Sequence, residues 1–500
     1  MSGTSIATTM LGLLKSFREI LLALSSFLLL RRCLRTPKGI PIAWPVLGML
    51  PGLLGNLHRL HDYCAQSLRA SGLTLLFKGP ILSKLDFIVT CDPSNANHIL
   101  KSAFQDYQKG PDFPEIFDPL GDGIIVADDD SWTMQRKAAH GLFSEANFRG
   151  FVAATSKGNA ERALVPMLAR AAELGEAVDL EDVLLRFTFN ASCKIVIGVD
   201  PNCLSEQEVP FARVFDEAEE VLALRHVFPM WWWKLMRWLN VGPEKTLARS
   251  LEMWDAHVMQ TIRERREANC EASPDMLSVY LQKGHDDKFL RDMVFNFMLA
   301  GRDTTGAGLA WFFWLVSKNP SVETKILQEL KARFGEADEQ TKVFDAESLR
   351  GLVYLHAALC ETLRLYPPVP FNHKWAAKAD VLPSGVSVEA GTRILISMYA
   401  MGRMERVWGK DCEEFRPERW ITEHGTIKYE PPQKFLAFNA GPRTCLGKDV
   451  ALMQMKIVAA ALIYNFEVEA VEGHVVKPKV SMILHMKNGF LAKVRKRRGC

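Results

Sequence analysis

The sequence predicts a mainly α-helical protein with small β-sheets, folded as one large domain. Over most of the region from about Ser131 to Arg364, apolar residues recur every three or four positions, which is the period of helices that pack on a core. One segment, Asp287–Ser317, is apolar on all sides around AGRDTTGAG, and such a helix belongs in the middle of a large core. No linker divides residues 52–500, so we expect this region to form one domain.

Short runs of strand-forming residues, bounded by turn residues, lie before and after the helical region. They predict strands at Leu73–Phe77, Phe87–Thr90, Val386–Val388, Arg393–Met398, Phe466–Val471 and Val480–Val494. Because the runs are mostly short, we expect small sheets at the periphery of the helical body.

The composition is that of an ordinary globular protein. The 500 residues are 48% hydrophobic and 24% charged, with a formal net charge of +3, which gives no support for nucleic-acid binding. The ten cysteines are scattered, with no C-x-x-C pair. This pattern argues against a disulfide framework and favours a reducing compartment.

Residues 1–30 are predicted to be a membrane anchor. Ile20–Leu30 is unbroken apolar sequence, and it reaches the ~20 residues that span a bilayer only when it is extended back to about Ser5, across three charged residues. Residues 31–51 then form a basic, proline-rich hinge, whose positive charge should keep the following domain in the cytosol. A monotopic helix is the second interpretation. A cleaved signal peptide is a further alternative, but the segment has neither the basic n-region nor the cleavage site of a signal peptide.

Near the C-terminus, one cysteine lies in the glycine-rich stretch FNAGPRTCLG. Gly441 and Gly447 would let the backbone approach a flat group closely and leave N–H groups free to point at the sulfur of Cys445. Phe438 could pack beside the thiolate and Arg443 could pair with an anion, while the start of a helix near Gly447 should lower the pKa of the thiol. The alternative is a buried, inert cysteine, but five constrained positions within ten residues argue against it.

This stretch resembles the haem-binding loop of the cytochrome P450s, F-x-x-G-x-R-x-C-x-G, and matches it at every fixed position. The resemblance covers roughly residues 35–495 and implies the fold of that family, with haem b (iron protoporphyrin IX) bound and Cys445 as the axial ligand of the iron. In this class of haem protein, the thiolate pushes electron density toward O–O cleavage. The resemblance also implies that Phe438, Gly441, Arg443 and Gly447 contact the cofactor.

In the long apolar helix, AGRDTT resembles the family's oxygen-activation motif. Three nearby glycines weaken the helix, and the Thr304 hydroxyl can bond a carbonyl one turn back, so we expect a local distortion that makes room for O₂ and water. A Thr hydroxyl beside an Asp can relay protons. The resemblance therefore implies catalytic roles for Asp303 and Thr304 and a cofactor contact for Ala300; a polar notch satisfied within a buried helix is the alternative.

Two further motifs resemble haem-propionate contacts of the family. In WTMQR, Trp132 and Arg136 share a helix face and could hydrogen-bond a propionate, although an amphipathic helix with one exposed arginine would look the same. Downstream, PPVPFNHK lies where the family often has another propionate-binding base. The register leaves this base as either His373 or Lys374.

Glu361 and Arg364 lie on one helix face, and alone they would suggest a solvated surface pair. They match the family's E-x-x-R motif, which pairs with an arginine of a later P-E-R-F segment. FRPERW supplies that residue here as Arg419. The resemblance implies a buried charged triad with a structural role.

Similarity in the runs FNHKWA, YAMGRMERVWG and FRPERW is greatest to the plant fatty-acid and alkane hydroxylase branch of the family. The segments that the family fold turns toward haem are mainly apolar and favour a lipophilic substrate, although core residues would look the same. They are Phe113–Ile125, Val294, Phe297, Met298, Val369–Phe371 and Met482–Leu484. We therefore expect a monooxygenase that hydroxylates a long aliphatic lipid; a non-oxygenating isomerase or dehydratase and a haem sensor are the alternatives.

The expected partners are membrane lipids, the lipophilic substrate and a reductase. The segment Pro229–Trp238 mixes four tryptophans with basic residues, which suits a membrane interface, although packing between two helices is the alternative. The chain has no complete dinucleotide fingerprint, so electrons must come from another protein, which the family implies is an NADPH-dependent flavoprotein. Lys137, Lys448 and Lys456 could help to dock it, or could simply be solvated. The expected location is the endoplasmic reticulum membrane.

Overall fold

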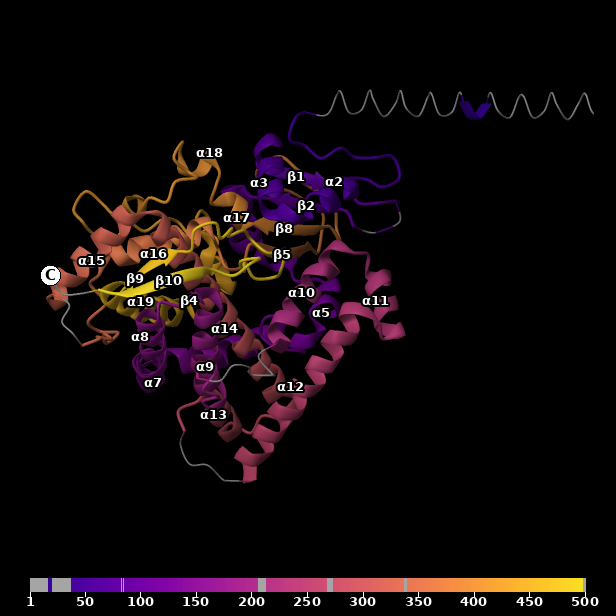
Figure 1. Ribbon diagram of the computed structural model, residues 1–500. Coiled ribbons are helices and arrows are strands. Elements are labelled where there is room, and N and C mark those ends of the chain that lie inside the picture. The colour runs from indigo at the N-terminus through magenta and orange to yellow at the C-terminus, as the bar shows by residue number, and fades with distance from the viewer. Residues whose placement is uncertain are drawn as a thin grey trace, which may run out of the picture.

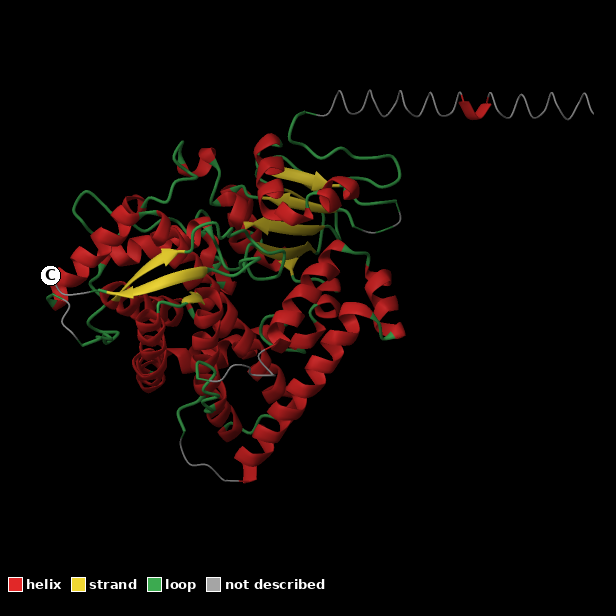
Figure 2. Ribbon diagram, in the orientation of Figure 1, coloured by secondary structure: helices red, strands yellow, loops and turns green. Residues whose placement is uncertain are grey.

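The computed structural model describes residues 17–19, 37–81, 83, 85–205, 213–267, 273–336 and 340–497. These residues form a mainly helical molecule with small sheets, as the sequence predicted (Figures 1 and 2). The predicted anchor falls almost wholly outside the described residues. Within the described part of the chain, no helix is both long and apolar enough to cross a membrane.

The helices account for most of the described residues. In chain order they are α2 Leu50–Gly55, α3 Leu60–Ala70, α4 Pro93–Asn97, α5 Asp112–Ile116, α6 Asp129–Ser144, α7 Ala146–Asn159, α8 Val165–Leu174, α9 Leu180–Ile197, α10 Arg213–Val227, α11 Met230–Leu239, α12 Gly242–Glu267, α13 Met276–Gln282, α14 Asp287–Lys318, α15 Pro320–Phe334, α16 Val353–Leu365, α17 Met398–Met401, α18 Glu405–Trp408 and α19 Lys448–Asn465. Figure 1 shows α14 in the middle of the molecule, with α9 alongside it.

Three sheets lie at the periphery of the described part. The strands are β1 Thr74–Phe77, β2 Phe87–Thr90, β3 Tyr107–Gln108, β4 Ala177–Asp179, β5 Phe371–Ala376, β6 Asp380–Val381, β7 Ser387–Val388, β8 Arg393–Ser397, β9 Phe466–Ala470 and β10 Leu491–Lys496. The largest sheet has the order β1-β2-β8-β5-β3, in which only the pair β2 and β8 is parallel. The second has the order β4-β10-β9, and β6 pairs with β7.

The strand predictions are confirmed for β1, β2, β7, β8 and β9 but are wrong for most of Val480–Val494. Only Leu491–Lys496 pairs there, as β10. The preceding residues turn inward instead, because the buried Glu181 side chain accepts a hydrogen bond from the Met486 backbone N–H at 2.9 Å. β5 was missed because FNHKWA is polar, and its pairing with β8 is decided by tertiary contact.

α14 confirms the predicted long central helix to within one residue at its C-terminal end. Its N-terminus is capped by the Asp286 carboxylate, which accepts from the Phe289 N–H at 2.8 Å. Trp311, Phe312 and Phe313 are consecutive and all almost fully buried, so the helix is enclosed by core on every side there.

α14 is continuous α-helix from end to end, so the expected local distortion in the oxygen-motif region does not interrupt the helix. The glycines serve close packing instead. A Cβ on Gly306 would lie 2.8 Å from Leu185 Cδ2 and 3.0 Å from Thr188 Oγ1, both on α9, and a Cβ on Gly301 would lie 2.7 Å from Ser192 Oγ. Because Gly301 and Gly306 have no side chains, α9 and α14 can pack closely together.

This packing predicts that Gly306→Ala destabilises the protein. The new methyl group would overlap the Leu185 side chain and approach the α9 backbone, which lies 3.3 Å away. Overpacking of this kind costs about 1–3 kcal/mol, measurable as a change in the free energy of unfolding by denaturant.

Gly150→Ala is the matched control, because Gly150 also lies inside a helix but has open space around its Cβ position. There alanine should stabilise by about 0.5–1 kcal/mol through helix propensity. Equal effects of the two substitutions would contradict the close-packing role of Gly306.

Candidate active site

Cys445 lies in a tight loop between two 3₁₀ turns, Leu436–Phe438 and Gly441–Arg443, and the start of α19. Its backbone N–H donates to the Phe438 carbonyl at 2.8 Å, which closes the loop. Gly441 has a φ of +68° and lies directly against the Leu100 carbonyl, so any side chain there would clash with backbone. Gly441 was predicted to let the backbone approach a flat group, but in the structure its backbone closely approaches the backbone of Leu100.

The Cys445 side chain is exposed, yet desolvation is the largest influence on its pKa. An exposed group that is also desolvated faces a recess walled by protein. The Gly447 N–H bonds the sulfur as predicted, and Arg136 and Lys448 also favour the thiolate, but desolvation outweighs them and the pKa is raised. The predicted lowering of the thiol pKa is thus wrong for the protein without a ligand on the sulfur.

Arg443 comes from this loop and meets two of the predicted residues of α6. Its guanidinium lies 4.6 Å from the centre of the Trp132 ring and donates to the Ala127 carbonyl at 2.7 Å and to the Asp128 carboxylate. Its Nε is buried and has no hydrogen-bond partner. Arg136, one turn along α6, is close enough to Cys445 and Arg443 to interact electrostatically with both.

Lys374 adds a further cation to this region. Its Nζ is almost fully buried, donates to the Tyr107 carbonyl at 3.0 Å and is repelled by Arg443. Burial lowers the pKa of Lys374 to about 7, and it lowers the pKa values of Lys109, Arg136 and Arg443 as well. Asp128 is the carboxylate that acts on Lys109, Lys374 and Arg443.

The ambiguity between His373 and Lys374 has a geometric answer. Successive residues of a strand point to opposite sides, and here only Lys374 points toward Arg443. The His373 ring packs against Phe113 at 5.3 Å and against His226 at 5.7 Å. Burial lowers the pKa of His373, and the nearby charges of Lys109 and Lys374 lower it further.

The residues present fit haem. Desolvation lowers the pKa values of the basic side chains gathered here, and the two propionates of haem would favour their charged forms. Arg443 has a free donor, its buried Nε. The hollow of about 170 Å³ beside Trp132 and Arg443 is also lined by Asp128, Asp129 and Asp130, so it does not itself suit an anion. Cys445, a soft thiolate ligand, faces a recess in the same region. Arg136 links the two parts, since it interacts with both the sulfur and Arg443.

The oxygen-motif residues point in two directions from α14. Ala300 is exposed and Thr304 is half-buried, although α14 runs through the core, so this face of the helix borders a hollow. The Thr304 hydroxyl donates to the Ala300 carbonyl at 2.8 Å, as predicted. Asp303 is fully buried and accepts from Arg302 at 2.5 Å, so the structure does not join its carboxyl to Thr304 directly.

The predicted Glu361, Arg364 and Arg419 contacts are present, and all three side chains are largely buried. Arg364 Nε and Nη2 each donate to Glu361 at 2.7 Å, and Arg419 Nε donates at 3.2 Å. The Trp420 indole N–H donates to the same carboxylate at 2.8 Å. Arg364 also donates to the carbonyls of residues 402, 412 and 414, which ties the loop before Arg419 to α16.

Most of the predicted substrate-facing segments meet in one group of side chains, here called the apolar cluster. From the predicted segments it contains Phe113, Ile116, Phe117, Leu120, Val294 and Met298, with Ile125, Phe297 and Met482 packed against it. Val369 and Leu484 instead pack in two other parts of the core. Histidines were not predicted here, but His226 contacts Phe117 at 5.4 Å and His373 contacts Phe113.

The tryptophan segment forms the amphipathic helix α11. Trp233 is 4% exposed and packs against Arg225 and Arg237, whereas Trp231, Trp232 and Trp238 are 62%, 43% and 79% exposed. The helix therefore packs through one tryptophan and presents three to the outside. Figure 1 shows α11 along the right-hand edge of the molecule.

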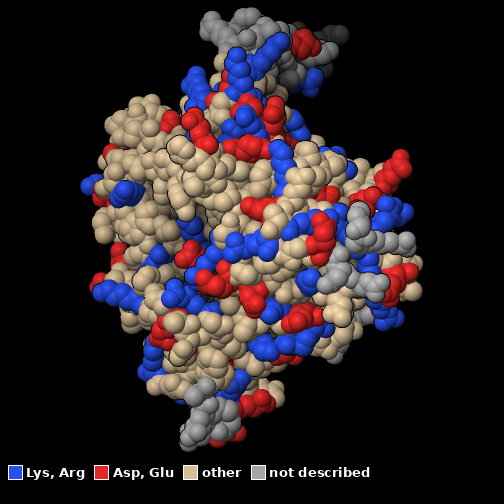
Figure 3. Space-filling model, turned by 90° about the vertical axis from the view of Figure 1, so that its left-hand side faces the viewer, with Lys and Arg blue, Asp and Glu red and all other residues tan. Residues whose placement is uncertain are grey.

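The predicted docking lysines are not equivalent. Lys137 and Lys448 are exposed, whereas Lys456 is half-buried, with its Nζ 3.4 Å from the Leu349 carbonyl. On the face drawn in Figure 3, basic and acidic side chains intermingle over the surface.

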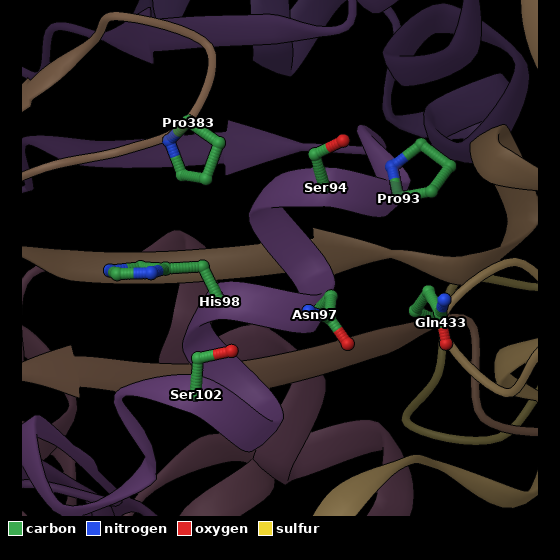
Figure 4. A pocket seen from close by; sticks show the side chains of 7 residues that line it. All are labelled: Pro93, Ser94, Asn97, His98, Ser102, Pro383 and Gln433. Atoms are coloured by element: carbon green, nitrogen blue, oxygen red, sulfur yellow. The ribbon is translucent and has the colours of Figure 1, made fainter.

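A second hollow, of about 320 Å³, opens around α4 (Figure 4). It is lined by Pro93, Ser94, Asn97, His98, Ser102, Pro383 and Gln433. It contains none of the predicted site residues, so it is separate from the cysteine loop and the cations around Arg443.

The loop around Cys445 and the basic side chains around Arg443 are compatible with haem bound through a thiolate, and comparison with known proteins identifies the family. The cytochrome P450 family profile matches residues 37–494, so the chain belongs to the cytochrome P450 family and is a monooxygenase, an oxidoreductase whose family binds haem iron. Members of this family generally need a redox partner and take lipophilic substrates.

The relatives are plant enzymes, which confirms the predicted resemblance. The chain is 45% identical to noroxomaritidine synthase 1 of Narcissus pseudonarcissus, over 96% of this chain and 97% of that protein. It is 42% identical to alkane hydroxylase MAH1 of Arabidopsis thaliana, over 98% and 99%, and 42% identical to cytochrome P450 86B1 of Arabidopsis thaliana, over 95% and 89%.

The excess of buried cations predicts that Lys374→Met weakens haem retention without weakening the polypeptide fold. Loss of a charge-assisted hydrogen bond costs about 1.5–3 kcal/mol, so haem should transfer from the holoprotein to apomyoglobin roughly 10- to 100-fold faster. Stability of the haem-free chain should not fall, because a buried, repelled cation is removed. Lys137→Met, at an exposed lysine of α6, should leave the transfer rate unchanged; equal rates in all three proteins would contradict the role of Lys374.

The Glu361 contacts predict that Glu361→Gln is strongly destabilising. It leaves two buried guanidinium groups without their carboxylate, at a cost of about 3–5 kcal/mol in the free energy of unfolding. Glu347→Gln is the control, because Glu347 pairs with Arg350 at the same i,i+3 spacing while both side chains are about three-quarters exposed. That change should cost less than about 1 kcal/mol, and a similar cost at both sites would refute a structural role for Glu361.

Proposed function

We propose that the protein hydroxylates a long-chain aliphatic lipid, a fatty acid or an alkane, with haem b bound by Cys445. The observation that carries the proposal is the apolar cluster, in which Phe113 and Phe117 meet Val294 and Met298 of α14. Burial of hydrocarbon against such side chains stabilises binding by about 25 cal/mol per Å². The similarity to an alkane hydroxylase supports the same substrate class.

In this proposal Cys445 ligates the iron, and Trp132, Arg136, Arg443 and Lys374 hold the propionates. Phe438, Gly441 and Gly447 shape the loop around the sulfur, and Ala300 lies against the ring face. Haem with a thiolate ligand supplies the activation of O₂ for insertion of oxygen into a C–H bond.

The protein's own contribution to the chemistry lies on α14. Thr304 borders the hollow next to Ala300, and its hydroxyl is oriented by the Ala300 carbonyl. Asp303 is the adjacent residue, and burial raises the pKa of its carboxyl well above the ordinary value, which favours its protonated form. Asp303 thus stores a proton one residue from the hydroxyl that would pass it on, through a water or a side-chain rotation.

A second candidate is the oxidation of a compact aromatic compound that carries a hydrogen-bonding group. The observation that favours it is the His226 and His373 pair beside Phe113 and Phe117, because a straight alkane offers imidazole nothing to bond. The similarity to noroxomaritidine synthase, at 45% identity, supports this candidate.

We further propose that the protein acts at the endoplasmic reticulum membrane, with residues 1–30 as its anchor, residues 31–51 as the hinge and residues 52–500 as the catalytic domain in the cytosol. Support comes from the three exposed tryptophans of α11, whose rings suit the headgroup level of a bilayer. Electrons would come from NADPH through a separate flavoprotein reductase, with Lys137 and Lys448 as available docking cations.

The test combines a ligation assay with a substrate panel. Reduced protein treated with carbon monoxide should show the red-shifted Soret band of a thiolate ligand, and Cys445→Ser should abolish it. Membranes that contain the protein, the reductase and NADPH should then convert straight-chain alkanes and fatty acids to alcohols, as read by mass spectrometry. Conversion of aromatic phenols alone would favour the second candidate, and turnover without O₂ would favour an isomerase or dehydratase.

A further inference from the structure

A group of buried charged side chains from four separate segments surrounds the side chain of Asp303. We call it the Asp303 cluster; its members are Asp303 and Arg302 of α14, Asp216 and Glu219 of α10, Glu181 of α9, and His485 of the loop before β10. All except Asp216 are buried, and the Asp216 side chain is 49% exposed.

Each buried acid in the cluster has at least one satisfied oxygen. Arg302 Nη1 donates to Asp303 Oδ1 at 2.5 Å and to Asp216 Oδ1 at 2.9 Å. His485 Nε2 lies 2.9 Å from Glu219 Oε2, and its Nδ1 lies 3.3 Å from Glu181 Oε1.

Two oxygens of the cluster remain without a partner. Asp303 Oδ2 and Glu219 Oε1 are both buried and form no hydrogen bond. One side-chain oxygen of each of these acids lies within 4.8 Å of the other and of a His485 ring nitrogen. Bare carboxylate oxygens in such a place are costly, and one proton on this pair of acids would remove one of their two charges.

The balance of charges in the Asp303 cluster also favours one proton on this pair of acids. Four carboxyl groups face two cations, Arg302 and His485, and Asp216 alone reaches water. Burial raises the pKa of Asp303 well above its ordinary value, and Glu219 adds to this while Arg302 opposes it. Burial opposes the charged form of His485, but Glu219 and Glu181 outweigh it and raise its pKa to about 10.

A divalent cation is a poor alternative for this position, although the three ligand types are suitable by distance. A protonated His485 has no lone pair with which to ligate a metal. Arg302 already places a full positive charge on Asp303. The cluster therefore suits a proton better than a metal ion.

We propose that Asp303 and Glu219 carry one buried proton between them, and that Glu219 is a positioning residue that keeps this proton on Asp303 for delivery toward Thr304, with His485 holding Glu219 in place. The His485 contact fixes the orientation of Glu219, and the charge of Glu219 in turn favours a protonated Asp303. When the proton leaves Asp303, a carboxylate remains there, and a proton from solvent restores it. No electron is transferred in this step. The proposal rests on the proposed function only for the destination of the proton.

The shared proton is testable by infrared spectroscopy of the resting holoprotein at pH 8, where ordinary carboxyl groups are ionised. A carbonyl band of a protonated carboxyl, shifted in D₂O, should be present in the wild type. It should be lost in Glu219→Gln and in Asp303→Asn, because each amide N–H would then satisfy the neighbouring bare oxygen. Glu220→Gln, at the adjacent α10 residue whose carboxylate pairs with Lys479 and is half-exposed, should retain the band.

Absence of the band in the wild type, or its persistence in Glu219→Gln, would overturn the proposal. This readout needs no substrate or reductase, so it stands apart from the test of the substrate class. In turnover assays, Glu219→Gln and His485→Gln should divert NADPH electrons to peroxide and lower product per NADPH by about 10-fold or more, while Glu220→Gln should not. Full coupling in both variants, with the band altered as expected, would refute their positioning role.

The pH dependence of unfolding gives a third readout. The pKa of His485 lies at about 10 in the folded protein, above its ordinary 6.5, so its stabilising contribution is complete below pH 6.5 and is lost as the pH rises toward 10. The wild type should therefore lose thermal stability over this interval more steeply than His485→Gln. Parallel profiles would contradict a buried, charged His485.

Discussion

The structure depends on one constraint: α14 must cross the middle of a close-packed core while it carries polar residues for chemistry. Its C-terminal half meets this constraint simply, because Trp311, Phe312 and Phe313 are buried among apolar neighbours. Its central part cannot, since Arg302 and Asp303 are also buried there. Glycines let α9 pack closely against one side of α14. The acids of α10 and His485 lie against the buried charges of Arg302 and Asp303 on a second side. The side that carries Ala300 and Thr304 is not covered.

Charge balance explains the rest of the site in the same terms. Around Arg443 the buried charges are mainly positive, and this surplus is what a dianionic cofactor would neutralise. Around Asp303 the carboxyl groups outnumber the cations, and a proton serves the same purpose. At Glu361 the balance is closed within the chain, because two guanidinium groups and an indole N–H surround one carboxylate. The sites around Arg443 and Asp303 could each accept an external ligand or proton, whereas the contacts of Glu361 have only a structural role.

α10 connects two parts of the molecule that the sequence treats as unrelated. Asp216 and Glu219 near its start reach the Asp303 cluster, and His226 near its end contacts Phe117 in the apolar cluster. Under the functions proposed above, a helix that touches both clusters would link substrate binding to proton supply. This link needs no distortion of α14, which is continuous in the structure.

The sequence by itself determined the helical class, the long central helix, the cysteine loop and the Glu361 contacts. The first two features follow from local periodicity, whereas the cysteine loop and the Glu361 contacts follow from motifs that resemble those of the family. Spacing alone places Glu361 and Arg364 one turn apart on α16. Only the tertiary structure decided which of His373 and Lys374 faces Arg443, where the chain of Val480–Val494 turns inward, and what surrounds Asp303. Those outcomes depend on side chains more than 60 residues apart in sequence, Glu219 and Asp303 among them, and on desolvation, which no local pattern encodes. The same desolvation reverses the expected pKa shift of Cys445, because burial is a property of the whole fold rather than of the loop.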